Sequence, residues 1–273
     1  MRRIITAVVF AGAAMIGCDL LAAAAAQGTL YTKDGGQKSG LIKWSARNKS
    51  YVITTKAANG STMDMEVPDK NVDRLDIKPP QGMDQAIKAV QAGHGAGQIK
   101  YLEGIVDEYA HLQWDQKAGS YLAEAYLAAN NPQKALATCN KIIDADKTAG
   151  YSGALAPTYW QALIKNGQHK KLEQVLAKAI SSGDRYASGS AMIARGDSIV
   201  AKDDTAAGAK QALVDGYLRV VFLYNDAEVG PRLRPEALYK AAKCFEKMHQ
   251  TSRSTDLIAE LKAKYSGSVW AQK

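Results

Sequence analysis

Cysteine and histidine are scarce in this chain of 273 residues. Outside the N-terminal segment the only cysteines are Cys139 and Cys244, which stand far apart within apolar helical patterns. This usage predicts buried free thiols, with a disulfide between the two as the alternative, and it excludes a disulfide-rich scaffold. The histidines are equally scattered and none belongs to a His-Glu-x-x-His arrangement, so no metal site is predicted from His94, His111, His169 and His249.

Motifs of catalysis and phosphate binding are also missing. Residues 93–97 (Gly-His-Gly-Ala-Gly) follow a helical stretch and lack the Gly-Lys-Ser/Thr ending of a phosphate loop, which favours a flexible connector. Residues 150–153 place the second glycine one position too early for a Gly-x-Ser-x-Gly nucleophile elbow. We therefore predict no catalytic residue, no cofactor and a non-enzymatic function.

Long apolar runs are confined to the N-terminus. Arg2 and Arg3 precede an apolar stretch at residues 4–21, and small residues fill positions 22–26. This order predicts a secretory signal peptide over residues 1–26, cleaved after Ala26. No other segment is long and apolar enough to span a bilayer.

Two alternatives to this cleavage stay open. The first is an uncleaved membrane anchor, which the charge of Asp19 disfavours. The second is lipidation of Cys18, because residues 15–18 (Met-Ile-Gly-Cys) resemble a bacterial lipobox, although the apolar run continues beyond the cysteine.

The chain carries a formal net charge of +8. Since an exported basic protein rarely meets nucleic acid, we expect its contacts to be anionic lipid headgroups, acidic polymers such as the cell wall, or acidic protein faces. The alternative is that the charge serves solubility alone.

Residues 27–78 follow the two-residue period of β-strands. Asp34-Gly35-Gly36 and Asn59-Gly60 are turn signals, and Met63, Met65 and Val67 alternate with acidic residues. We predict five short strands that close into a small barrel, because closure hides both edges of so small a sheet. Trp44 and Tyr51 form either a ligand platform or part of the core or rim.

This segment resembles the Sm-like small barrels at the front of some bacterial envelope proteins. The resemblance rests on the Asp34-Gly35-Gly36 turn, the strand at residues 40–42 (Gly-Leu-Ile) and the strand at residues 72–75 (Val-Asp-Arg-Leu).

After a linker at residues 79–82 (Pro-Pro-Gln-Gly), apolar residues recur at helical spacing through residues 83–273. The fold class is therefore α+β with two domains: the β domain and an all-α solenoid. Breakers divide the second domain into five antiparallel helix pairs, predicted at residues 83–92 with 98–112, 115–129 with 132–146, 154–166 with 168–182, 185–202 with 205–225, and 234–249 with 251–265.

Each of three pairs repeats one nine-residue offset, from Tyr126 to Ala135, from Leu163 to Leu172 and from Phe245 to Ser254. Leu122-Ala123-x-x-Tyr126 with Ala135-x-x-x-Cys139, and Ala241-Ala242-x-x-Phe245 with Ser254-x-x-x-Ile258, resemble the signature of the tetratricopeptide repeat (TPR) family, as found in the bacterial envelope. Trp160 departs from it, because a small residue is expected there, and the spacing between pairs is irregular.

A solenoid offers a surface rather than a reaction. We expect a non-catalytic scaffold that is exported to the bacterial envelope, is periplasmic or outer-membrane associated, and binds protein or peptide partners. The alternative is that the β domain binds a glycan, the cell wall or a membrane surface. Candidate partner-binding residues, with packing or a solvated face as the alternative, are Tyr217, Tyr224, Tyr239, Lys240, Lys243 and Lys247.

Overall fold

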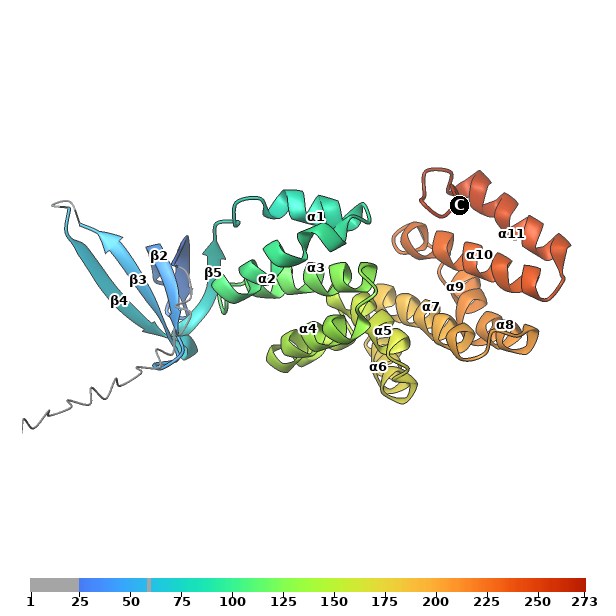
Figure 1. The fold of residues 1–273 in the computed structure, drawn as a ribbon, viewed down its shortest axis with the longest axis horizontal. Helices are drawn as coiled ribbons and strands as arrows, with labels where there is room; N and C mark the ends of the chain where they lie inside the picture. Colours follow the sequence, from blue (N-terminus) through green and yellow to red (C-terminus); the bar gives the residue numbers. More distant parts are fainter. Residues whose placement is uncertain (1–24, 58–59) are drawn as a thin grey trace, which may run out of the picture.

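The computed structural model describes residues 25–57 and 60–273 and shows a β-sheet followed by a row of helices (Figure 1). Most of the predicted signal peptide, including Cys18, lies outside the described residues. Among the residues that are described, no helix combines the length and the apolar character that a bilayer span requires. Ala26, the residue expected to precede the cleavage site, is buried and begins the first strand.

Five strands form one antiparallel sheet, as the alternating pattern predicts. The turn between the first two strands is the predicted one, because Gly35 takes a positive φ of 85° and Asp34 accepts the amide of Gly36. The spatial order is β4-β3-β2-β1-β5, with β1 (Ala26–Thr32), β2 (Gln37–Ser45), β3 (Ser50–Lys56), β4 (Thr62–Pro68) and β5 (Val72–Ile77).

The sheet is open, so the predicted closed barrel is wrong. Within the part of the chain that the structure describes, no ladder joins the edge strands β4 and β5. Closure is not needed to bury the apolar face, because Leu112 of the helical domain inserts into the core of the sheet. Its side chain and those of Leu30, Ile42 and Ile53 have no exposed surface. Leu112, with Tyr109 and Trp114 beside it, thus packs on the apolar face that a barrel would turn inward, and both edges stay open.

Trp44 and Tyr51, the predicted ligand platform, lie at this junction of sheet and helices. The Trp44 ring stacks on the His111 ring with 4.5 Å between centroids, and the Tyr51 hydroxyl donates to the His111 carbonyl oxygen over 3.1 Å. From the helical side, Trp114 Nε1 donates to the carbonyl oxygen of Ile77 over 2.8 Å. Both aromatic rings therefore pack the two domains together.

Helices fill most of the chain after residue 82, and their bounds lie within four residues of the predicted ones except at residues 205–225. They are α1 (Met83–Gln91), α2 (Ile99–Glu108), α3 (Trp114–Ala128), α4 (Pro132–Ala145), α5 (Leu155–Lys165), α6 (His169–Ser181), α7 (Arg185–Lys202), α8 (Ala206–Ala212), α9 (Leu218–Leu223), α10 (Gly230–Lys247) and α11 (Thr251–Lys264).

The helix predicted at residues 205–225 is present without a break from Ala206 to Leu223, but a π turn at Leu213–Tyr217, which the sequence did not predict, lies between α8 and α9. Gly216 in this turn lies against Gly196 of α7, and a Cβ added to Gly216 would come within 2.8 Å of the Gly196 Cα atom. Only glycine permits so close an approach of two backbones. We attribute the extra residue of the turn to this contact, which helical periodicity does not reveal.

The first helices of the later pairs, α3, α5, α7 and α10, contact one another in turn and form a row. From this row α4 and α6 project toward the lower side of the view in Figure 1. The buried apolar residues form two clusters, one from Met83 to Ala194 and one from Met192 to Leu261. The two clusters meet along α7, which contributes to both.

The residues matched to the repeat signature are buried, except Ile258, which is half-buried. Ala123 and Ala135 have no exposed surface, which lets α3 and α4 approach closely, and the Tyr126 hydroxyl bonds to Glu103 of α2. Trp160, the departure from the signature, is accommodated because its Nε1 donates to the carbonyl oxygen of Gly150 over 2.9 Å. The buried set is Leu122, Ala123, Tyr126, Ala135, Leu163, Leu172, Ala242, Phe245 and Ser254.

Candidate functional site

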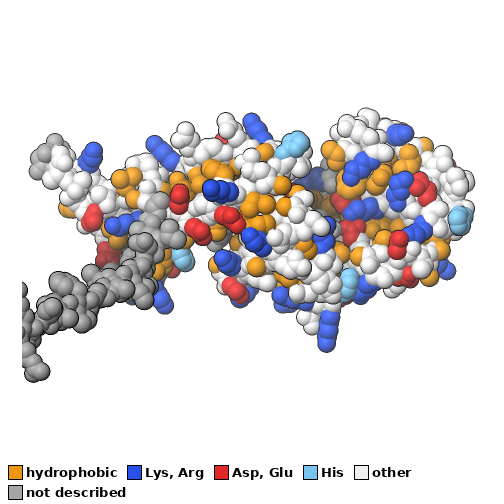
Figure 2. Space-filling view, in the orientation of Figure 1, with side chains coloured by type: hydrophobic (Ala, Val, Ile, Leu, Met, Phe, Trp, Pro, Cys, Tyr) orange, Lys and Arg blue, Asp and Glu red, His pale blue; other side chains and the backbone are white. Residues whose placement is uncertain are grey.

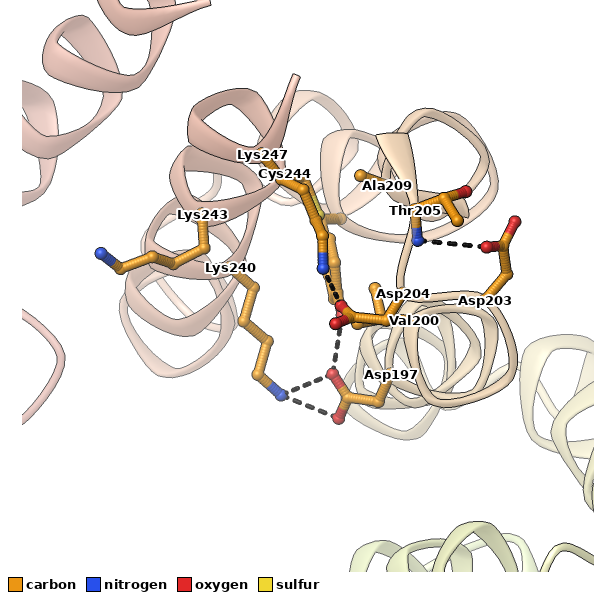
Figure 3. Close-up of a pocket in the computed structure, with 11 residues that line it drawn as sticks. Asp197, Val200, Asp203, Asp204, Thr205, Ala209, Lys240, Lys243, Cys244 and Lys247 are labelled. Atoms are coloured by element: carbon orange, nitrogen blue, oxygen red, sulfur yellow. Dashed lines mark hydrogen bonds and ion pairs between the residues drawn. The ribbon is translucent and has the colours of Figure 1, made fainter. Parts of the chain in front are cut away.

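Four of the six predicted partner-binding residues line one pocket of about 290 Å³ between α7, α8 and α10 (Figure 3). Lys240, Lys243 and Lys247 face it from α10, where their spacing of three and four residues puts them on one side of the helix. Tyr217 reaches it from the π turn. Opposite the lysines stand acidic residues of α7 and of the loop that follows it, namely Asp197, Asp203 and Asp204.

Asp197 is the centre of a partly buried polar network. Lys240 Nζ lies 2.8 Å from both carboxylate oxygens, and the Tyr217 hydroxyl donates to Oδ1 over 2.9 Å. Gln161 of α5 donates to Oδ2 over 2.9 Å, and Glu236 pairs with Lys240 over 2.6 Å. The network therefore joins α5, α7 and α10.

The network also sets the protonation of its members. Burial alone would lower the pKa of Lys240, but Asp197 and Glu236 together raise it above the usual value. Burial, followed by the charge of Asp197, raises the pKa of Tyr217. Lys240 therefore stays a cation, and the neighbouring carboxylates of Asp197 and Glu236 neutralise its charge.

The other two lysines are also paired. Lys247 forms an ion pair with Asp204, as Figure 3 shows, and Lys243 pairs with Glu246 over 2.8 Å. The expected basic face of α10 is thus largely neutralised by acidic neighbours. Such pairing does not favour attraction of an anionic surface by these three residues alone.

The three tyrosines lie in different surroundings. Tyr217 and Tyr224 are buried, and the Tyr224 hydroxyl bonds to Ser188 Oγ over 2.9 Å. Tyr239 is half-buried and packs on Trp270 with 5.4 Å between ring centroids. Two of the three rings therefore fill space between helices, whereas Tyr239 reaches the surface.

A second hollow, not anticipated from the sequence, lies between the first helices α3, α5, α7 and α10. Figure 2 shows the surface indented between the two halves of the helical array. Glu124 stands on the α3 side, Thr158 on α5, Tyr186 on α7 and Arg232 on α10.

This hollow continues along α3 toward the sheet. Glu124 and Thr158 also line the next hollow, of about 580 Å³, and Gln116 is shared between that hollow and a third at the sheet. Gln116, Ser120, Glu124 and Leu127 recur every three or four residues, so one face of α3 forms the continuous floor. We call the stretch lined by Gln116, Ser120, Glu124, Thr158, Tyr186 and Arg232 the trough.

The trough holds two unpaired charges of opposite sign. Glu124 forms no hydrogen bond or ion pair with any residue that the structure describes, and burial raises the pKa of its carboxyl group. The Arg232 guanidinium lies 3.8 Å above the ring of Tyr186 and likewise has no ion pair within residues 25–57 and 60–273. Apolar periodicity predicted both α3 and α10 from the sequence. It did not predict that the faces carrying Glu124 and Arg232 line the same hollow.

A serine and a histidine come together elsewhere, without the exposure that a nucleophile needs. His169 Nδ1 lies 2.9 Å from Ser198 Oγ, but Ser198 is 1% exposed, so a substrate carbonyl cannot reach it. Cys139 and Cys244 are buried free thiols, as predicted. In the described part of the chain, no group of three His, Cys, Asp or Glu side chains is placed to hold a metal ion.

Comparison with known proteins gives two similar solved structures. No family model matches the chain, and no curated protein matches it. A crystal structure of a variant form of a putative kinesin light chain of Podosopora anserina, with nearly identical TPR-like repeats, is 17% identical and has a TM-score of 0.48 over 68% of this chain and 94% of that chain. A second crystal structure of the same repeats is 16% identical, with a TM-score of 0.46 over 66% of this chain and 91% of that one.

Proposed function

We propose that this chain is a non-catalytic TPR-like scaffold that holds an extended segment of a protein partner in the trough. The observation that carries the proposal is the continuous hollow along the row of first helices, with an unpaired carboxylate and an unpaired guanidinium in it. Stacked helix pairs create such extended surfaces as a consequence of their geometry.

The chemistry of the trough suits a polypeptide. Glu124 offers an acceptor to a lysine or arginine side chain, and Arg232, held over Tyr186, offers two parallel donors to a carboxylate or a main-chain carbonyl. Thr158 adds a hydroxyl to the hollow that holds both charges. Ser120 lies in the adjoining hollow, where its hydroxyl donates to the Gln116 carbonyl oxygen and can still accept. A partner with a basic residue followed by an acidic one would satisfy both charges.

The test places a photocrosslinking amino acid at Ser120, inside the trough, and in a matched control at the exposed Lys262 of α11. In cell-envelope extract, we expect a discrete adduct from Ser120 and none of the same mass from Lys262. The added substitution Arg232→Glu should reduce the adduct at least about fivefold, since a reversed charge repels what the guanidinium attracts. Equal adduct yields from Ser120 and Lys262, or a yield that Arg232→Glu does not change, would contradict the proposal.

We further propose export of the mature chain to the envelope, with loss of the N-terminal segment. Cleavage after Ala26, as expected from the sequence, would remove the first residue of β1, which is buried and pairs with Ile42, and would leave the strand from Gln27 onward. The intact mass of the protein from fractionated cells tests this. Cleavage gives a mass that starts near Ala26, lipidation gives a mass that starts at a modified Cys18, and an uncleaved anchor keeps the full mass and contradicts the proposal.

A further inference from the structure

The outer edge of β5 is open toward the helical domain. Lys78 N donates to the Gln27 carbonyl oxygen, so in this antiparallel ladder Lys78, Asp76 and Arg74 direct their backbone groups toward β1. The alternate residues Leu75 and Ile77 therefore direct their N–H and C=O groups outward. The bond from Trp114 Nε1 to the Ile77 carbonyl oxygen agrees with this parity and ends the free edge at Ile77.

The open edge forms one wall of a cleft of about 660 Å³, and α2, α3 and α4 form the other. We call it the junction cleft, and its lining includes Asp69, Asp73, Leu75, Asp115 and Lys141. An edge strand with free donors and acceptors beside a cleft is the arrangement on which an extended peptide adds a strand.

The sheet side of the junction cleft is acidic, although the whole chain is basic. Asp69 and Asp73 line it, Asp115 lies across from them at the start of α3, and the Oδ1 atom of Asp115 is buried without a hydrogen-bond partner in the described structure. The other oxygen, Oδ2, accepts the backbone N–H of His111 over 2.9 Å. A buried carboxylate with an unpartnered oxygen is costly, and a cation placed nearby in the junction cleft would stabilise its charge.

Two basic residues also line the junction cleft. Arg74 lines it from β5, with its guanidinium 3.9 Å above the ring of Tyr31. Lys141 lines it from α4 and is exposed. The three aspartates outnumber these two cations, so the charge that complements the junction cleft is positive.

The wall opposite the edge is held rigidly. His111 and Gln113 both take left-handed backbone conformations, with φ of 65° and 70°. Between them Leu112 is buried in the core of the sheet, and the Tyr51 hydroxyl bonds to the carbonyl oxygen of His111. These contacts hold His111 and Gln113 in their strained backbone conformations. The loop is therefore rigid, and the junction cleft is already formed before a ligand binds.

We propose that the junction cleft is a second docking site, which adjoins the trough at Gln116, and that a partner's extended basic segment adds there as a strand to the free edge of β5. An arginine or lysine side chain of that segment meets the exposed Asp69 and Asp73 in the field of Asp115, and its main chain bonds to the outward groups of Leu75. Val72 and Val106 line the same cleft and cover the apolar side chains that alternate with the basic ones.

The probe is a short, capped, fluorescent peptide that alternates arginine with valine, titrated against the whole protein by fluorescence anisotropy. Two companion peptides carry glutamate in place of arginine, or arginine with N-methylated amides that cannot donate. We expect the arginine peptide to bind and both companions to bind at least about tenfold more weakly, because one has the wrong charge and the other cannot add to a strand.

Two variants locate the site. Asp115→Asn should weaken the arginine peptide about tenfold, whereas Asp76→Asn, on the face of β5 that points away from the junction cleft, should leave its affinity unchanged. Equal binding of the N-methylated peptide would overturn strand addition. Equal effects of the two variants, or binding that neither variant changes, would overturn the assignment to this cleft.

Discussion

Individual side chains bind neighbouring helix pairs to each other. Asp197 receives hydrogen bonds from α5, from the π turn and from α10, and it is 15% exposed in its side chain. A carboxylate so placed is stable only while its cation is present, because desolvation penalises the unpaired charge. Removal of the Lys240 cation should therefore destabilise the protein.

Lys240→Met should destabilise the protein by about 3 kcal/mol, since it leaves Asp197 buried without its cation. Urea unfolding followed by circular dichroism measures the change. Adding Asp197→Asn to Lys240→Met should restore part of the loss, because it removes the uncompensated charge. The matched control is Lys243→Met on the same helix, whose exposed pair with Glu246 should contribute less than about 0.5 kcal/mol. Equal losses from both lysine variants would contradict this account.

A second residue-scale prediction concerns acid. The pKa of Asp226 is lowered from 3.8 to about 2, first by the hydrogen bond from the Val229 amide and then by Arg185, whose Nη2 lies 2.7 Å away. Because the folded pKa lies below the unfolded one, this carboxylate contributes its full stabilisation above pH 3.8 and loses it as the pH falls toward 2.

Asp226→Asn should therefore lower stability at neutral pH, and the difference from the wild type should shrink as the pH falls through that window. Thermal unfolding at a series of pH values measures it. A difference that stays constant with pH would show that the loss arises from shape and not from the carboxylate.

At the scale of elements, the π turn depends on two glycines. Gly216→Ala should destabilise by about 1–3 kcal/mol, because the new Cβ would meet the Gly196 backbone of α7. Gly104→Ala in α2 is the matched control: nothing lies within 4 Å of its new Cβ, so it should stabilise by up to about 1 kcal/mol. Urea midpoints give both values, and a stabilising Gly216→Ala would mean that α7 and the π turn can separate freely.

The helices and the sheet differ in how well the sequence predicts them. Most helices begin and end near the predicted residues because caps and apolar periodicity are local, as where Asn131 accepts the amide of Lys134 beside Pro132. The prediction of a closed barrel failed because closure depends on which other segments pack on the sheet. Here Leu112, from a loop distant in the sequence, packs into the core of the sheet. Such contacts between separate segments leave no periodic signal.

The candidate site was only partly foreseeable for the same reason. The sequence places Lys240, Lys243 and Lys247 on one helix face, and in the structure they line a common pocket, which the sequence did not predict. It does not show that Asp197 and Asp204, on and just after α7, pair with two of them. The trough was missed because Glu124 and Arg232 belong to helices far apart in the chain.

At the scale of the whole molecule, the helical core is divided in two, and each cluster holds one cysteine. Cys139 lies in the first cluster and Cys244 in the second, and burial raises the pKa of these thiols to about 12 and about 11. Since a thiolate is the reactive form, both should be inert toward alkylating reagents in the folded protein.

In rising urea we expect the two cysteines to become reactive at different concentrations, because each reports the opening of its own cluster. Pulsed alkylation with peptide mapping by mass spectrometry measures both midpoints in one sample. A single shared midpoint would show that α7 couples the clusters into one unit.

The division along α7 has a consequence for the trough, which runs across it from α3 to α10. A partner segment lying there would touch helices of both clusters, so its binding free energy would be lost when either one opened. Occupancy would then make the melting of the two clusters cooperative. Calorimetry should show two broad transitions in the free protein merging into one sharper transition at higher temperature, and the scaffold would become a single rigid body only while it carries its cargo.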